Sequence, residues 1–280
     1  MFKSLLLPYV NDLCEGAVLS SSMELAEKMA AHLVVLVVPD APRPVISEFG
    51  ANSYDIYAQL TTAANERASE LVAKLKARCA KMPGSIEVRL ADATAIFSSD
   101  SAALHARYAD LSILPAAPTS HPDSSLTHEY CENLLLNSGQ PVLVVPAQWT
   151  ALQLPKRIVI AWQPTREASR AVRDAMPFLR QAESVEILIV DPKLGANGHG
   201  PEPGADIAAH LARHGLKVQV TTQASFGKPI SESLLAHARF VEADLLVAGG
   251  YGHSRLSEFL FGGVTRRLLQ NTETPILFSH

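Results

Sequence analysis

The chain repeats one pattern of strands and helices, and this repeat limits its fold more than any other feature. In each half an aspartate precedes one apolar run and a proline precedes the next. The interval is 31 residues both times, from Asp110 to Pro141 and from Asp244 to Pro275. Because chance agreement of this kind is improbable, we interpret the chain as a tandem duplication of one domain.

Each half alternates short apolar runs with stretches whose apolar residues recur at helical spacing. The predicted strands are Ser4 to Leu7, Leu33 to Val38, the alternating run Ile86, Val88 and Leu90, Leu111 to Leu114, Val142 to Val145, Ile158 to Trp162, Val185 to Val190, the run Val218 and Val220, Leu245 to Ala248, and Ile276 to Phe278. The predicted helices carry Leu19, Met23, Ala26 and Ala30; Ala68, Leu71 and Leu75; Leu104; Val172, Ala175, Met176 and Leu179; and Leu234, Leu235 and Ala238.

Strands that alternate with helices predict an α/β fold with a doubly wound parallel sheet, and the continuous apolar character of the strands suits a sheet covered on both faces. We expect two domains, 1–150 and 151–280, joined near Ala147 to Lys156. The offset between the halves falls from 153 to 134 residues along the chain, so the first half holds about 19 extra residues. We expect these in Ala41 to Asn65, as a loop that leads into a helix.

Two helix starts are predicted from local motifs. Asp12 with Glu15 three residues later reads as a capping box, and Thr165, at the position that matches Asp12, reads as a cap by itself.

Composition excludes several classes of protein. Hydrophobic residues make up 48% and charged residues 19% of the 280-residue chain, which is typical of a folded globular protein. No apolar run is long enough to span a bilayer, and the start of the chain lacks a secretory pattern, so we expect a cytoplasmic protein. The three cysteines indicate no disulfide framework, and a net charge of −4 without a basic run argues against nucleic-acid binding.

A glycine-rich loop follows the strand Leu245 to Ala248. It runs Gly249-Gly250-Tyr251-Gly252, then nine residues, then Gly262-Gly263-Val264-Thr265 and a helix. Glycines let backbone N–H groups approach phosphate oxygens, and the N-terminus of the following helix adds partial positive charge. His253 and Arg255 within the loop, with Arg266 and Arg267 after it, supply cations. The pattern predicts an anion site.

These glycines could instead serve only to form tight turns. Eleven of the fifteen glycines lie in the second half, and Pro115, Pro118, His128 and Glu129 occupy the matching positions of the first. Two copies of one fold need the same turns, yet the first copy forms them without glycine. We therefore interpret the glycines as a binding function that only the second half retains.

The family motif G-x-x-G, nine residues, then G-S or G-T is matched at its three glycines, and the whole chain resembles the universal stress protein family, as a tandem two-domain member. Gly249, Gly252 and Gly262 carry the resemblance. It implies a Rossmann-like, five-stranded sheet of order 3-2-1-4-5 in each half. It also implies ATP or a related adenine nucleotide at the switch point between strands 1 and 4, where open α/β sheets usually bind ligands. Whether Mg²⁺ accompanies the nucleotide stays open.

The resemblance also suggests which residues would hold the nucleotide. Carried over by position, the contacts come from Gln163, Val190, Ala248, Gly249, Gly252, Gly262, Gly263 and Val264. Val190 would meet the adenine, and the glycines with Val264 would meet phosphates and ribose. Two positions depart from the family pattern: Gly263 replaces a serine or threonine, and Gln163 replaces an acidic residue. Val10 matches Gln163 in the first half, which we expect not to bind nucleotide.

Other candidate sites are weaker. His121, His128 and Cys131 are close in sequence, but their spacing matches no strong zinc pattern, and we predict no metal site. Trp162 and Tyr251 could stack on a base, although Trp162 ends a predicted core strand. No Walker motif, nucleophile elbow or paired catalytic carboxylates are visible.

Three functions remain open. The first is a stress-response regulator that binds ATP, ADP or AMP in its second domain. The second is a nucleotide-independent scaffold. For it the resemblance implies that the domains pair through their final strands, Val142 to Val145 and Ile276 to Phe278, and leaves further homodimerisation open. The third is slow ATP hydrolysis, for which His253 is the one candidate general base. We expect no membrane and no nucleic-acid partner.

Overall fold

The computed structural model describes residues 1–39, 52–91, 97–146, 149, 154–195, 198–251 and 263–280. The first half contains β1 Ser4–Pro8, the 3-10 turn η1 Asp12–Cys14, α1 Ala17–Met29, β2 His32–Val37, α2 Asn52–Cys79, β3 Ser85–Leu90, α3 Ser98–Ala106, β4 Leu111–Pro115, α4 Ser124–Asn137 and β5 Val142–Val145. The second half contains β6 Arg157–Ala161, α5 Arg166–Leu179, β7 Ser184–Val190, α6 Ala205–Arg213, β8 Val218–Gln223, α7 Ile230–Phe240, β9 Leu245–Gly249, α8 Gly263–Asn271 and β10 Ile276–Ser279. The alternation predicted from the sequence is confirmed.

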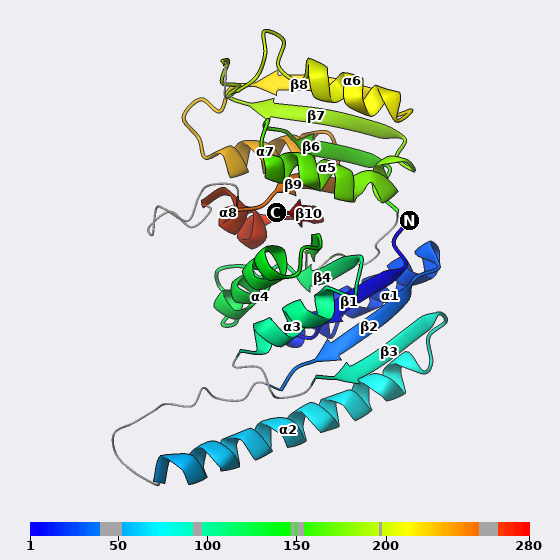
Figure 1. Ribbon diagram of the computed structural model, residues 1–280, viewed down its shortest axis with the longest axis vertical. Helices are drawn as coiled ribbons and strands as arrows, with labels where there is room; N and C mark the ends of the chain where they lie inside the picture. Colours follow the sequence, from blue (N-terminus) through cyan, green and yellow to red (C-terminus); the bar gives the residue numbers. More distant parts are fainter. Residues whose placement is uncertain (40–51, 92–96, 147–148, 150–153, 196–197, 252–262) are drawn as a thin grey trace.

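The ten strands form one sheet in the order β3-β2-β1-β4-β5-β10-β9-β6-β7-β8. Each half therefore has the strand order 3-2-1-4-5, and all its strands run parallel. The two halves meet where β5 and β10 pair antiparallel. Figure 1 shows the second half above this contact and the first half below it. Leu277 lies opposite Leu143, its counterpart in the duplication, so a local twofold axis passes between these two residues.

Helices cover both faces of the sheet. Alternate strand residues enter two separate cores. Leu5 and Leu7 belong to the core that includes residues of α1, α2, α5 and α6, whereas Leu6 belongs to the core that includes residues of α3, α4, α7 and α8. Because both faces are covered, the strands read as unbroken apolar runs. Among the described residues, no helix is both long enough and apolar enough to cross a membrane.

The repeated aspartates connect neighbouring strands through hydrogen bonds. One carboxylate oxygen of Asp110, just before β4, accepts hydrogen bonds from the backbone N–H groups of Lys3 (2.6 Å) and Ser4 (2.9 Å) at the start of β1. Asp244 does the same for Lys156 (3.0 Å) and Arg157 (2.8 Å) at the start of β6. These hydrogen bonds explain why an aspartate occurs at the same place in both halves.

We expect Asp110→Ala and Asp244→Ala each to lower the free energy of unfolding by about 1–2 kcal/mol, since each removes a charged acceptor from two N–H groups. Urea denaturation of the two variants measures this loss. Asp206→Ala, on the exposed side of α6, serves as the control. A loss in only one half would contradict an equivalent role.

Two local predictions are wrong. Asp12 and Glu15 form no capping box, because α1 begins at Ala17 after Gly16, without a side-chain cap, and Glu15 pairs with Lys74. The extra residues of the first half are also not a loop from Ala41 to Asn65: residues 52–65 are helical, and α2 has 28 residues where α6 has 9. Residues 41–51 lie outside the described residues. The predicted cap at Thr165 is confirmed, since its hydroxyl accepts the N–H of Ala168 at 3.2 Å.

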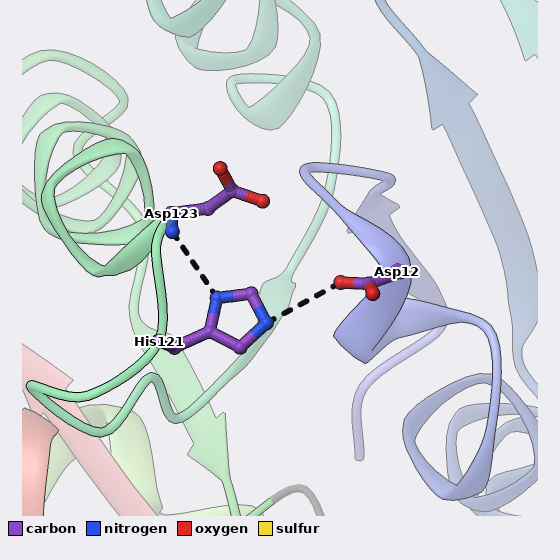
Figure 2. A group of neighbouring side chains, drawn as sticks. All are labelled: Asp12, His121 and Asp123. Carbon is purple, nitrogen blue, oxygen red and sulfur yellow. Dashed lines mark hydrogen bonds and ion pairs between the residues drawn. The ribbon is translucent and has the colours of Figure 1, made fainter.

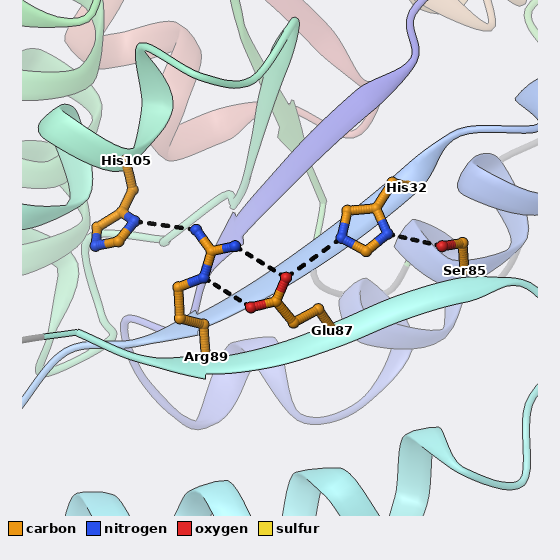
Figure 3. Close-up of polar contacts among 5 residues, drawn as sticks. All are labelled: His32, Ser85, Glu87, Arg89 and His105. Carbon is orange, nitrogen blue, oxygen red and sulfur yellow. Dashed lines mark hydrogen bonds and ion pairs between the residues drawn. The ribbon is translucent and has the colours of Figure 1, made fainter.

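A polar cluster covers the outer strands of the first half (Figure 3). Arg89 donates to both carboxylate oxygens of Glu87 at 2.8 and 2.9 Å, and its remaining guanidinium nitrogen lies 3.4 Å from His105. His32 lies 3.5 Å from Glu87 and 2.7 Å from the hydroxyl of Ser85. The Arg89 hydrogen bonds hold the pKa of Glu87 below its usual value of 4.5.

This shift gives Glu87 a pH-dependent contribution to stability. A carboxylate with a lowered pKa stabilises the fold above its unfolded-state pKa, and the contribution is lost as the pH falls through the folded-state pKa. We expect Arg89→Met to lower the free energy of unfolding by only a few tenths of a kcal/mol near pH 7, because the Glu87 side chain is 42% exposed. The difference should be smaller at about pH 3 than near pH 7, because Glu87 is then more protonated. Urea denaturation at both pH values checks this, and an unchanged difference at pH 3 would refute it.

Candidate functional site

The candidate site lies at the switch point of the second half, where β6 stands between β7 and β9. From β6 the chain passes through α5 to β7 on one side, while β9 joins from the other side. The carboxyl ends of these strands lie at one edge of the sheet, so Gln163, Val190 and Gly249 come to the same edge. The fold thus brings these three predicted residues together at the ends of neighbouring strands.

Gly249, the last residue of β9, lies against the first turn of α5. A Cβ on Gly249 would lie 2.7 Å from the backbone nitrogen of Ala168 and 2.9 Å from the carbonyl carbon of Glu167. No side chain fits there. Gly249 is therefore required for helix–strand packing, a structural reason that the sequence interpretation did not include.

Gly250 is buried at the contact between the two halves. A Cβ there would meet Leu135 of α4 at 3.3 Å and Phe278 of β10 at 3.7 Å. Its N–H donates to the carbonyl of Ser279 at 2.8 Å. This glycine also serves packing, and it places the end of β9 directly beside the first half.

Gly263, the first residue of α8, is different. It is exposed, and a Cβ placed on it would meet no atom within 4 Å. Packing therefore does not require glycine at this position. Among the described residues, a ligand therefore has room beside the start of α8, and the N–H groups at a helix N-terminus attract anions.

Arginine side chains surround this edge. The Arg166 side chain is 95% exposed at the start of α5 and lies 3.6 Å from Glu167. Arg266 and Arg267 are exposed on α8, and within the described part of the chain no ion pair joins either one to a carboxylate. Three cations at the ends of α5 and α8 give the edge the charge that an anionic ligand needs.

The other predicted contacts divide into two groups. Val190 and Ala248 are 5% exposed and pack in the core, whereas Gln163 is exposed and Val264 is 40% exposed. Val190 and Ala248 can offer only backbone groups to a ligand. Gly252, Gly262, His253 and Arg255 lie outside the described residues. Trp162 is partly buried and packs against the core that includes residues of α5.

An open hollow of about 560 Å³ lies beside this edge, at the ends of β7 and β8. Its lining residues are Asp191, Pro192, Lys193, Thr222, Gln223 and Ala224. The carboxylate of Asp191 accepts the backbone N–H of Ser225 at 2.9 Å, and hydrogen bonds from Ser225 lower the pKa of Asp191. Sequence reasoning missed this hollow, because nothing in the sequence distinguishes Asp191 from an ordinary turn residue.

Helix α4 of the first half lies beside Tyr251, two residues after the end of β9. Tyr251 has a left-handed backbone conformation (φ 53°), and its N–H lies 3.4 Å from the hydroxyl of Thr265. Burial raises the pKa of the Tyr251 hydroxyl, and Cys131 and Glu132 on α4 raise it further. The end of β9 is thus enclosed between α8 and a helix of the other half.

The matching edge of the first half is built differently. Pro115 is buried inside β4, and His128 and Glu129 lie within α4. Helix α4 extends from Ser124 to Asn137, so the two positions that match Gly262 and Gly263 of the second half lie inside a helix. Asp12 and His121 come together at this edge instead, 3.4 Å apart.

Comparison with solved structures shows the same fold over both halves. A universal stress protein from Archaeoglobus fulgidus DSM 4304 is 15% identical, with an alignment that covers 99% of this chain and 95% of that one and a TM-score of 0.70. A functionally unknown protein from Pseudomonas aeruginosa PAO1 is 15% identical, with 99% and 92% covered and a TM-score of 0.55.

Sequence comparison identifies the second half directly. Residues 155–280 match the model of the universal stress protein family. No curated protein has a matching sequence. Residues 155–280 thus match the universal stress protein family in sequence, and both halves share the fold of a solved universal stress protein, as two such folds in tandem.

Proposed function

We propose that this protein is a cytoplasmic stress-response regulator that binds an adenine nucleotide, ATP, ADP or AMP, in its second half. The observation that carries the proposal is Gly263, an exposed residue at the start of α8 whose added Cβ would meet no atom within 4 Å among the described residues. Helix α8 lies beside the end of β9, since the Thr265 hydroxyl accepts the N–H of Tyr251. A glycine that packing does not need, at the start of a helix, is suited to a close approach by phosphate oxygens.

Charge supports the same ligand. Phosphates at the start of α8 would lie near exposed Arg266 and Arg267, and Arg166 stands at the start of α5. The hollow beside Asp191 and Lys193 offers space for the base and ribose at the ends of β7 and β8. A nucleotide in this position would bridge the switch point, as ligands do in open α/β sheets.

Isothermal titration with ATP, ADP and AMP, each with and without Mg²⁺, tests the proposal. We expect at most one site per chain, weakened by Gly252→Val in the loop. Gly16→Val, at the start of α1 in the first half, is the control, since Gly16 has a negative φ of −88° and an added Cβ there meets no atom within 4 Å among the described residues. Two equivalent sites would contradict the assignment of the first half as a structural partner.

A nucleotide-independent scaffold is the second candidate. It is favoured by Gly249 and Gly250, whose presence packing alone explains, and by the absence of a hydroxyl at Gly263. In this function the protein would act through the contact between β5 and β10 and through a homodimer interface. Mass spectrometry of the denatured, freshly purified protein separates the two, because bound ATP would eliminate the scaffold and support the regulator.

A further inference from the structure

Three side chains that can bind a metal meet at the switch point of the first half, between the ends of β1 and β4 (Figure 2). Asp12 lies in η1 after β1, while His121 and Asp123 lie between β4 and α4. One ligand atom from each side chain can be chosen so that all three lie within 4.8 Å of one another. The sequence pairs His121 with His128 and Cys131, but the fold brings it to two carboxylates instead.

The arrangement holds two negative charges around one imidazole. His121 Nε2 lies 3.4 Å from Asp12 Oδ1, and its Nδ1 accepts the backbone N–H of Asp123 at 3.2 Å. The His121 side chain is only 18% exposed, so its ring is held in place. In the described part of the chain, no lysine or arginine pairs with Asp12 or Asp123. The carboxylates thus lack a fixed cation.

A buried oxygen next to this group also lacks a partner. Asn11 is 9% exposed, and its amide nitrogen donates to the hydroxyl of Thr127 at 3.2 Å. That hydroxyl bonds to the carbonyl of Asp123 at 3.3 Å, so the amide lies between η1 and the start of α4, as the three ligands do. Within the described part of the chain, no group forms a hydrogen bond with the Asn11 side-chain oxygen. An unpaired buried amide oxygen is costly unless it meets a cation or water.

This group is specific to the first half. The positions that match Asp12, His121 and Asp123 in the second half are Thr165, Arg255 and Ser257, none of which resembles the first-half ligand. Thr165 caps α5, whereas Asp12 caps no helix. The two halves therefore carry different chemistry at the same place in the fold.

We propose that Asp12, His121 and Asp123 bind a divalent first-row transition-metal ion, with Asn11 as a further oxygen donor. One imidazole and two carboxylates suit Zn²⁺, Co²⁺ or Mn²⁺ better than Mg²⁺, which prefers oxygen ligands and keeps its waters. Binding at Nε2 requires the ring proton to move to Nδ1, with loss of the hydrogen bond from Asp123. The site needs no nucleotide and does not depend on the function proposed above.

Titration of the nucleotide-free protein with Zn²⁺ tests the site. His210 and His214 stack at 4.9 Å on α6 and could take up Zn²⁺ by themselves, so all proteins carry His210→Gln and His214→Gln. We expect one equivalent of Zn²⁺ to bind, and His121→Gln, Asp12→Asn and Asp123→Asn each to weaken binding at least tenfold. His32→Gln, beside the single carboxylate of Glu87, is the matched control and should bind as before.

Nitrogen-15 NMR of the histidine rings adds a direct readout. Zn²⁺ should move the proton of His121 from Nε2 to Nδ1, and Mg²⁺ should not. Circular dichroism establishes that the variants fold, and Asp12→Asn keeps the test valid if His121→Gln does not fold. No saturable Zn²⁺ binding, equal affinity in the Asp12→Asn and Asp123→Asn variants, or an unchanged His121 tautomer would each overturn the proposal.

Discussion

Gly249→Ala is expected to lower the free energy of unfolding by about 3 kcal/mol, near the upper end for overpacking. The added methyl group would lie 2.7 Å from the Ala168 nitrogen and 2.9 Å from the Glu167 carbonyl carbon. Both are backbone atoms within the first turn of α5, so no side-chain rotation relieves the clash. Either β9 or the start of α5 must move. Urea denaturation monitored by circular dichroism measures the loss.

Gly263→Ala is the matched control, since its methyl group meets no atom within 4 Å. We expect a change within about 0.5 kcal/mol, because alanine also favours the helix. A similar loss in both variants would mean that glycine at Gly249 is needed for a reason other than contact with α5.

Gly263→Ser should tighten the binding of an adenine nucleotide roughly 5- to 30-fold, if the proposed site is correct. A hydroxyl at the start of α8 can donate to a phosphate oxygen, and a hydrogen bond to a charged acceptor contributes about 1–2 kcal/mol. Space is available, because nothing lies within 4 Å of the new Cβ. Isothermal titration of wild type and variant with the same nucleotide gives the ratio.

Gly263→Ala separates the hydroxyl from the added bulk. If alanine leaves affinity unchanged or weakens it while serine tightens it, the hydroxyl contacts the ligand. If serine and alanine weaken binding equally, the ligand approaches the backbone of Gly263 too closely for any side chain, and this prediction fails.

The fold could be predicted from the sequence to a large extent because the repeat is carried by residues with local tasks. Asp110 and Asp244 bind the backbone at the start of a neighbouring strand, so both copies keep them at the same interval before the final strand. Thr165 marks the start of α5 in the sequence, because its hydroxyl accepts the N–H of Ala168, only three residues later. The conformation of the extra residues could not be predicted, because their count says nothing about whether they extend a loop or a helix, and here residues 52–65 lengthen α2.

The sites were harder to predict, because their members lie far apart in the sequence. Gly249 was interpreted as a ligand contact, and only its distance from Ala168 reveals a packing role. Asp12 was interpreted as a helix cap, yet its carboxylate faces His121, 109 positions later in the chain. Parallel strands bring such residues to one edge, and no local pattern records that meeting. Gly263 could be identified from the sequence, but its free surroundings could not.

The twofold relation between Leu143 and Leu277 has an evolutionary consequence. In a homodimer with this contact, every substitution occurs on both sides of the axis at once, so a change that suits one site is imposed on its twin. Fusion of the two copies in one chain removes that constraint. One copy can place His128 and Glu129 within its last helix while the other keeps glycines at the matching positions, and their association no longer depends on protein concentration.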